Sequence, residues 1–272
     1  MVRFMSLSSG SCGNCYYLEM QDDVKGHCAI LIDAGVSLRR LKQTLQSNGL
    51  SMDAFGAILV THDHLDHIRS LASYCKKLSK PVYATSILHK ALAARSFGAP
   101  YLASCRRDLP EGEYAEICGF MVKYFVVPHD ATQTVGYSII AGDYKFVIMT
   151  DIGGVTDEAL QLASEADTVV IESNYDVEML MAGPYTFELK MRICKGHGHL
   201  SNDACASAIK QIWHPGLKNL FLCHLSEHNN TPSLALAATR KALKEVGANE
   251  GDINLRALPR QTPSPMIILS HY

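Results

Sequence analysis

The chain has 272 residues, 47% of them hydrophobic, and a formal net charge of -2 at pH 7. These values exclude a disordered chain and the overall positive charge typical of many nucleic-acid binders, so any contact with nucleic acid has to be local. The nine cysteines lack the dense spacing of a secreted disulfide scaffold, and no apolar run approaches the roughly 18 residues of a membrane span, so we expect a cytoplasmic protein that does not enter the membrane.

Short runs of β-branched and aromatic residues alternate with longer segments of helical periodicity, which predicts an α/β fold. No repeat or linker interrupts this pattern, and we expect one domain over residues 1–272. The predicted strands are Phe4–Leu7, Cys15–Met20, Cys28–Asp33, Ala57–Thr61, Val82–Ala84, Val122–Val127, Val135–Ile140, Lys145–Thr150, Thr168–Ile171 and Leu220–Cys223. The predicted helices are Ser37–Ser47, Ile68–Lys80, Leu88–Arg95, Asp157–Ala163, Ser201–Trp213 and Ser233–Val246.

The most distinct break in this pattern lies at about 175–197, where we predict an inserted loop or hairpin. Long loops in compact domains are often functional. Lys190 and Arg192 in this segment are candidates for contacts with substrate phosphates, although most basic runs are only solvated faces. Tyr185 and Phe187 are candidates for stacking on an unpaired base.

Four potential metal ligands crowd the turn that follows the predicted strand Ala57–Thr61. The run reads His62-x-His64-x-Asp66-His67, and helical periodicity begins directly after it. Imidazole nitrogens and carboxylate oxygens suit zinc, with manganese or iron as further options, and a tight turn lets alternate side chains converge on neighbouring ions. Three histidines and an aspartate within six residues therefore indicate a metal site.

An apolar strand that ends in one polar residue recurs three times downstream, at His129, Asp151 and His224. Each of these residues taken alone has an ordinary alternative, because the histidines can be structural and the aspartate can cap a turn. Ligands at strand ends along one rim of a sheet are, however, how a site is assembled from distant segments. The recurrence strengthens all three as candidates.

Together these residues resemble the metallo-β-lactamase superfamily, whose pattern is HxHxDH followed by single His, Asp and His ligands at the ends of later strands. Ile32–Gly35 is similar to the superfamily's first motif, an aspartate before a glycine turn. The resemblance spans nearly the whole chain and implies a four-layer αββα sandwich with two divalent ions per chain, Zn or Mn, with Fe as a further option. It implies that His62, His64 and His129 hold one ion, that Asp66, His67 and His224 hold the other, and that Asp151 bridges them.

A narrower resemblance, to the WalJ (YycJ) family of small bacterial exonucleases, is carried by Ser9–Asn14, Glu172–Asn174, Gly183–Tyr185, Gly198–Asn202 and His224–Ser226. It implies a metal-dependent phosphodiesterase that removes nucleotides from DNA 5′ ends through attack of a hydroxide activated by two metal ions. DNA is then the expected partner. Because substrates vary within such a superfamily, a hydrolase of a small phosphodiester or other small ester on the same metals stays open as an alternative.

The resemblance also suggests roles for individual side chains. Asp66 is expected to bind one ion and to orient the attacking hydroxide. His199 is the candidate for protonating the leaving 3′ oxygen, and its alternative is a capping role for the helix that begins near Ser201. Ser11 and Asn14, in a Ser/Gly-rich turn, are candidates for contacts with substrate phosphate or with metal ligands. The sequence leaves the oligomeric state open.

Overall fold

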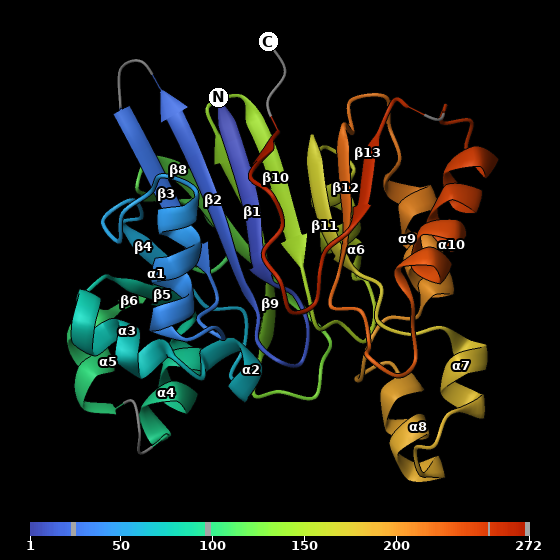
Figure 1. The fold of residues 1–272 in the computed structure, drawn as a ribbon, viewed down its shortest axis with the longest axis horizontal. Helices are drawn as coiled ribbons and strands as arrows, with labels where there is room; N and C mark the ends of the chain where they lie inside the picture. Colours follow the sequence, from blue (N-terminus) through green and yellow to red (C-terminus); the bar gives the residue numbers. More distant parts are fainter. Residues whose placement is uncertain (23–25, 96–98, 250, 270–272) are drawn as a thin grey trace.

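A computed structural model of the chain describes residues 1–22, 26–95, 99–249 and 251–269. Two mixed seven-stranded sheets pack face to face in the middle of the molecule, and helices cover the outer face of each (Figure 1). The expected four-layer αββα sandwich is therefore confirmed.

Seven strands form the first sheet, in the spatial order β14 (Ile267–Ile268), β1 (Val2–Ser8), β2 (Cys15–Asp22), β3 (Gly26–Ile32), β4 (Ala57–Leu59), β5 (Val82–Ala84) and β6 (Arg106–Asp108). Neighbours are antiparallel from β14 to β3 and parallel from β3 to β6, where helices make the crossovers. These helices are α1 (Leu38–Ser47), α2 (Leu65–Ile68), α3 (Leu71–Leu78), α4 (Ser86–Ala94) and α5 (Ala99–Cys105).

Seven strands form the second sheet, in the order β13 (Asn254–Ala257), β12 (Asn219–Cys223), β11 (Thr168–Glu172), β10 (Tyr144–Met149), β9 (Thr134–Ala141), β8 (Phe120–Val127) and β7 (Ala115–Ile117). β7 to β10 form an antiparallel meander, and β10 to β13 are parallel. The helices on this side are α6 (Asp157–Ala163), α9 (Asn202–Ile212) and α10 (Pro232–Glu245). Since β8, β10, β11 and β12 run in one direction, their carboxyl ends share one edge of the sheet.

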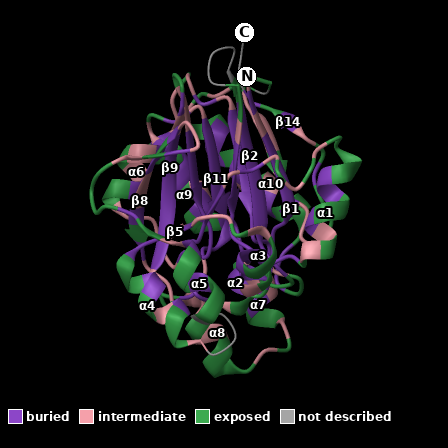
Figure 2. Cartoon of the chain, turned by 90° about the vertical axis from the view of Figure 1, so that its left-hand side faces the viewer, coloured by how far each residue is buried: buried purple, intermediate pink, exposed green. Residues whose placement is uncertain are grey.

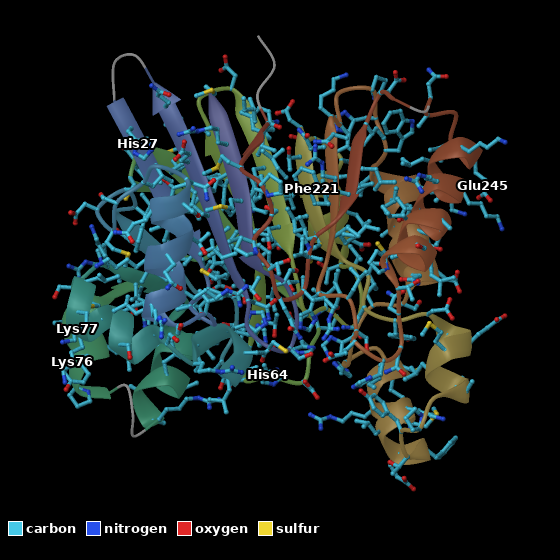
Figure 3. The ribbon with its side chains drawn as sticks, viewed as in Figure 1. His27, His64, Lys76, Lys77, Phe221 and Glu245 are labelled. Carbon is cyan, nitrogen blue, oxygen red and sulfur yellow. The ribbon has the colours of Figure 1, made fainter. Side chains whose placement is uncertain are left out.

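The hydrophobic core fills the space between the sheets. β11 and β12 are buried at every position, because the other sheet covers one face and helices cover the other (Figure 2). Across the interface the ring of Phe4 lies 5.5 Å from that of Phe146 and 5.6 Å from that of Phe221, between centroids. Figure 3 labels Phe221 in this position. These aromatic contacts fix the spacing of the two sheets and, with it, the positions of the strand ends.

Two sequence predictions need correction. The predicted helix Ile68–Lys80 corresponds to α3, and its first residue belongs to the separate short helix α2. The segment at about 175–197 is neither loop nor hairpin, because it forms α7 (Val177–Ala182) and α8 (Phe187–Cys194). Each of these helices begins at a side-chain cap, in which Asp176 accepts from the backbone of Met179 and Thr186 from that of Leu189. They have six and eight residues, and so few turns give an apolar period too little length to predict a helix from the sequence.

Two further observations bear on the expectations drawn from composition. Within the described residues, no helix is both long enough and apolar enough to cross a membrane. All nine cysteines lie among those residues, and each carries a free thiol.

Candidate metal centre

The candidate ligands meet at one end of the sandwich, where His64 is labelled in Figure 3. His62 to His67 follow β4 of the first sheet, whereas His129, Asp151 and His224 follow β8, β10 and β12 of the second. Packing of the two sheets therefore brings together side chains that are up to about 160 residues apart, counted from 62 to 224 in the sequence.

The ligands expected from the sequence form two clusters in which the possible ligand atoms lie within 4.8 Å of one another, and a third group, Asp151, Glu172, His199 and His224, overlaps the second. The first consists of His62, His64 and His129. The second consists of Asp66, His67, Asp151 and His224. Each cluster takes residues from both sheets, and every candidate from the sequence pattern belongs to one of them.

The backbone turns sharply after β3, β10 and β12. Asp33, Asp151 and His224 have φ angles of 64°, 55° and 51°, in the left-handed region that residues other than glycine seldom adopt. Each follows a strand of the core directly or after one residue. Non-glycine residues in this conformation are concentrated at functional sites, where the surrounding structure holds them.

The histidines are held by their outer ring nitrogens. Nδ1 of His67 donates to Asp33 over 2.6 Å, and Nδ1 of His129 donates to the carbonyl of Gly198 over 2.6 Å. In His62 the partner of Nδ1 is the hydroxyl of Thr61, at 3.0 Å. Such hydrogen bonds fix the tautomer and direct Nε2 toward a metal, as in metalloproteins generally.

The other ring nitrogens fit a metal ion. Nε2 of His62, His129 and His224 is buried and has no hydrogen-bond partner among the described residues. Buried polar atoms are almost always satisfied, so three such atoms at one place match ligands of a cation. Burial lowers the pKa of His62 and of His129, which keeps both imidazoles neutral and able to bind a metal.

The second cluster is richer in charge. Although burial opposes ionisation, the pKa of Asp151 lies well below its usual range because His224 and His67 stabilise its anion. Conversely, Asp151 raises the pKa of His224 to about 10 despite the burial of the ring. The protons on these histidines supply positive charge beside Asp151, as a divalent ion would when bound.

Comparison with known proteins identifies the family of this chain. A family model described as the β-lactamase superfamily domain matches residues 29–224, more than half of the chain. The chain belongs to the β-lactamase superfamily. It is 32% identical to the exodeoxyribonuclease WalJ of Streptococcus pneumoniae serotype 2 over 86% of this chain and 85% of that one. It is 32% identical to the exodeoxyribonuclease YycJ of Bacillus anthracis over 92% of each.

Among solved structures, Zn²⁺-bound PqqB from Methylobacterium extorquens superposes with a TM-score of 0.68. The match covers 97% of this chain and 99% of PqqB at 18% sequence identity, a level at which it supports the fold alone. Superfamily membership and the two clusters together make this chain a metal-dependent hydrolase that binds divalent metal.

Glu172, the last residue of β11, is a residue of the site to which the sequence assigned no role. Its Oε1 accepts hydrogen bonds from Nδ1 of His199 at 2.8 Å and from Nδ1 of His224 at 2.9 Å. Its Oε2 accepts from the backbone nitrogens of Ile152 and Leu200. The carboxylate is fully buried and links two loops of the site. Burial lowers the pKa of His199, but the Glu172 carboxylate outweighs this effect, so the pKa is raised.

The four candidates for substrate contact lie in different places in the structure. Ser11 and Arg192 line the cavity over the clusters, and Arg192 forms an ion pair with Asp130. Asn14 is buried, and its amide nitrogen lies 2.8 Å from Nε2 of His67 and 3.1 Å from Oδ2 of Asp66, so it contacts candidate ligands. Lys190 lies outside the cavity and donates to the carbonyl of Met181.

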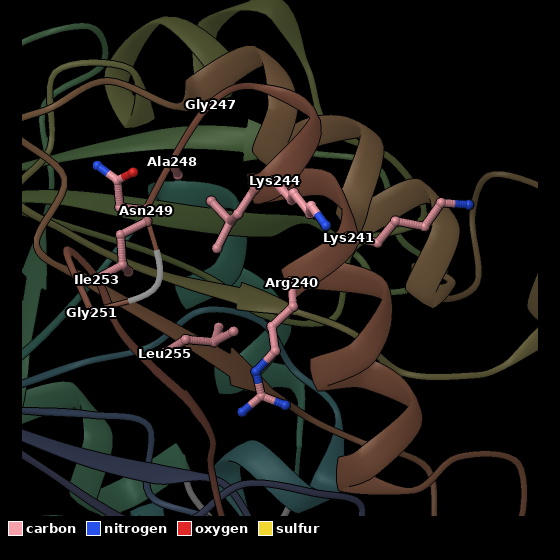
Figure 4. Close-up of a pocket in the computed structure, with 10 residues that line it drawn as sticks. Arg240, Lys241, Lys244, Gly247, Ala248, Asn249, Gly251, Ile253 and Leu255 are labelled. Carbon is pink, nitrogen blue, oxygen red and sulfur yellow. The ribbon is translucent and has the colours of Figure 1, made fainter.

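The cavity over the clusters has a volume of about 320 Å³, and His199 lines it together with Asp66, Asp151 and His224. A larger hollow lies between α10 and the segment before β13, and Figure 4 shows the side chains of Arg240, Lys241 and Lys244 around it. The residues known to line that hollow include no His, Cys, Asp or Glu. The chemistry of the superfamily therefore assigns the functional site to the smaller cavity.

A close backbone approach at Gly35 gives a first prediction. A Cβ at this position would lie 1.7 Å from the carbonyl oxygen of Asp66 and 2.5 Å from the nitrogen of Asn14. We expect Gly35→Ala to lower the free energy of unfolding by about 1–3 kcal/mol or more, because backbone has to move. Urea denaturation measures this, with Gly154→Ala as the control, since its Cβ meets nothing nearer than 3.7 Å. Equal midpoints for the two variants would contradict the prediction.

Proposed function

We propose that the protein is an exodeoxyribonuclease that removes nucleotides from DNA 5′ ends at a two-metal centre. The main support is the position of Asp151, whose Oδ2 lies 3.1 Å from Nε2 of His67 and whose Oδ1 lies 4.0 Å from Nε2 of His129. A carboxylate between two sets of ligands suits a pair of divalent ions, which phosphodiesterases use to hold the attacking and leaving oxygens. The names of the WalJ and YycJ relatives support DNA as the substrate.

The donor set suggests how the ions are held. In this proposal Asp151 would contribute to holding both ions. Nitrogen and oxygen ligands suit Zn or Mn, with Fe as a further option. When bound, such ions neutralise phosphate charge and lower the pKa of water at the site. The remaining ligands are His62, His64 and His129 for one ion and Asp66, His67 and His224 for the other.

The chain's own side chains supply orientation and proton transfer. Asp66 lines the cavity and orients the attacking water through a carboxylate oxygen. His199 lines the same cavity, and since its Nδ1 is bonded to Glu172, its Nε2 is left to protonate the 3′ oxygen that leaves. The raised pKa of His199 favours the protonated ring that this step needs. Arg192 is placed to contact a phosphate at the mouth of the cavity.

We also infer a cytoplasmic location, because free thiols persist in a reducing compartment.

The volume of the cavity favours one alternative. At about 320 Å³ it is at the small end of ligand pockets, which span roughly 300–1,000 Å³, so a small phosphodiester or other small ester would also fit.

End-labelled DNA separates the two functions. With Mn or Zn supplied, a 5′-labelled strand is expected to release its label as the first product, whereas a 3′-labelled strand is expected to give a ladder. A metal chelator should stop both reactions. RNA of the same sequence and a small chromogenic phosphodiester serve as comparison substrates. Turnover confined to the small diester would contradict the DNA proposal and favour the alternative.

A further inference from the structure

The cavity over the metal centre has one apolar side. Tyr185, Leu189 and Ile193 line it there, from the turn before α8 and from α8 itself, and we call these three residues the α8 wall. Their spacing of four residues places Leu189 and Ile193 on one face of the helix, and Tyr185 precedes that face. Candidate ligands and the residues Asn174 and Asn229 line the same cavity.

The α8 wall lies outside both clusters of the hydrophobic core. None of the residues of α8 is buried, and Leu189 is 38% exposed. The helix is held instead by polar contacts, the ion pair of Arg192 with Asp130 and a hydrogen bond from the nitrogen of His199 to the carbonyl of Ile193. Apolar side chains that a helix leaves open beside a reactive centre indicate a contact surface for a ligand.

The chemistry of the cavity identifies the kind of group that fits. Its polar side, with Arg192 at the edge, suits phosphate, and the α8 wall suits a flat ring. The ring of Tyr185 meets that of His228 edge-on at 6.4 Å, which supports it from a second segment. A phosphate joined to a flat ring describes a nucleotide.

We propose that the α8 wall receives the base of the terminal nucleotide, which has to be unpaired when its phosphodiester bond is cleaved. This inference rests on the proposed exonuclease function. A cavity of about 320 Å³, at the small end of ligand pockets, suits one nucleotide better than a base pair. The contact is tolerant of sequence, because every base presents a π face.

The test removes the side chain of the α8 wall and the terminal base, separately and together. Tyr185→Ala and Leu189→Ala are assayed on a single strand with an ordinary 5′-terminal nucleotide and on the same strand with an abasic one. On the ordinary strand we expect each substitution to lower kcat/KM by roughly 5- to 100-fold, the range found when a stacking side chain is replaced by alanine. On the abasic strand we expect wild type and variants to have nearly equal kcat/KM. The effects of removing two groups that touch are not additive, so the substitution costs little once the base is gone.

The abasic strand also shows whether the metal centre of each variant is intact. Phe187→Ala is the matched control. The sequence made Phe187 a candidate for stacking, but the structure leaves this aromatic residue of α8 71% exposed and outside the lining of the cavity. It should behave as wild type on both strands. Equal losses on the ordinary and abasic strands, or a base-dependent loss in Phe187→Ala, would overturn the assignment of the α8 wall.

Duplex ends test the requirement for an unpaired base. A mismatch at the terminal pair is expected to raise the wild-type rate, because less free energy is spent on opening that pair. Equal rates on matched and mismatched ends would overturn the requirement. No cleavage of any DNA by the wild type would instead overturn the proposed function, and the assignment of the α8 wall with it.

Discussion

Asp151→Ala is expected to abolish hydrolysis and to reduce the metal content of the purified protein. Asp151 is the carboxylate that approaches both clusters, so its removal takes one ligand from each proposed ion. Metal ions supply several kcal/mol of stabilisation to a phosphoryl transition state, and a loss of about 4 kcal/mol corresponds to a fall in kcat/KM of about 1,000-fold. The raised pKa of His224 should also fall, because Asp151 raises it most.

Metal content per chain, measured by elemental analysis, and turnover on DNA check this prediction together. Asp53→Ala is the control, because the Asp53 side chain is 94% exposed and lies outside the cavity. It should keep both metal and activity. Full turnover by Asp151→Ala would show that Asp151 does not bridge the metals.

Glu172→Gln is expected to destabilise the fold and to slow the reaction. Each carboxylate oxygen of Glu172 accepts two hydrogen bonds, one oxygen from the rings of His199 and His224 and the other from two backbone nitrogens. A glutamine keeps only one oxygen, so its NH₂ group faces either the two backbone donors or the two ring nitrogens, which could accept from it only by moving their protons to Nε2. A buried donor without a partner costs about 1–3 kcal/mol, and the free energy of unfolding should fall by at least this much.

Three measurements separate the positioning role of Glu172 from a purely structural one. Urea denaturation gives the stability, elemental analysis gives the metal content, and the pH profile of kcat should lose the contribution of a protonated His199. His199→Ala is the comparison, since it should keep its metals and slow cleavage without loss of stability. Loss of metal in His199→Ala would make His199 a ligand or a structural residue. An unchanged pH profile in Glu172→Gln would leave Glu172 with a structural role only.

The sequence predicted the central strands of both sheets and missed the strands at the edges. β6, β7, β13 and β14, which lie at the four sheet edges, have two to four residues each. Their sequences include Arg-Arg-Asp and Ala-Glu-Ile, which lack an apolar run because an edge strand is covered on fewer sides. Such strands form because a neighbouring strand offers hydrogen bonds, and a single sequence does not contain that information.

The candidate site shows the same division. His62 to His67 were predictable because four possible ligands adjoin in the sequence, and recurrence at strand ends added His129, Asp151 and His224. Glu172 also ends an apolar strand, but the sequence named it only within the motif Glu172–Asn174 and gave it no role, because it acts through histidines that are 27 and 52 residues away. The metal roles of all these residues stay predictions until the variants are measured.

Both candidate clusters draw on both sheets, and this has a thermodynamic consequence. An ion that binds there cross-links two halves of the chain that otherwise meet through apolar side chains such as Phe4 and Phe221. Free ion at a hundredfold of its Kd would add about 2.7 kcal/mol to the free energy of unfolding by mass action. The supply of divalent ion would then govern how long the folded protein survives as well as how fast it works.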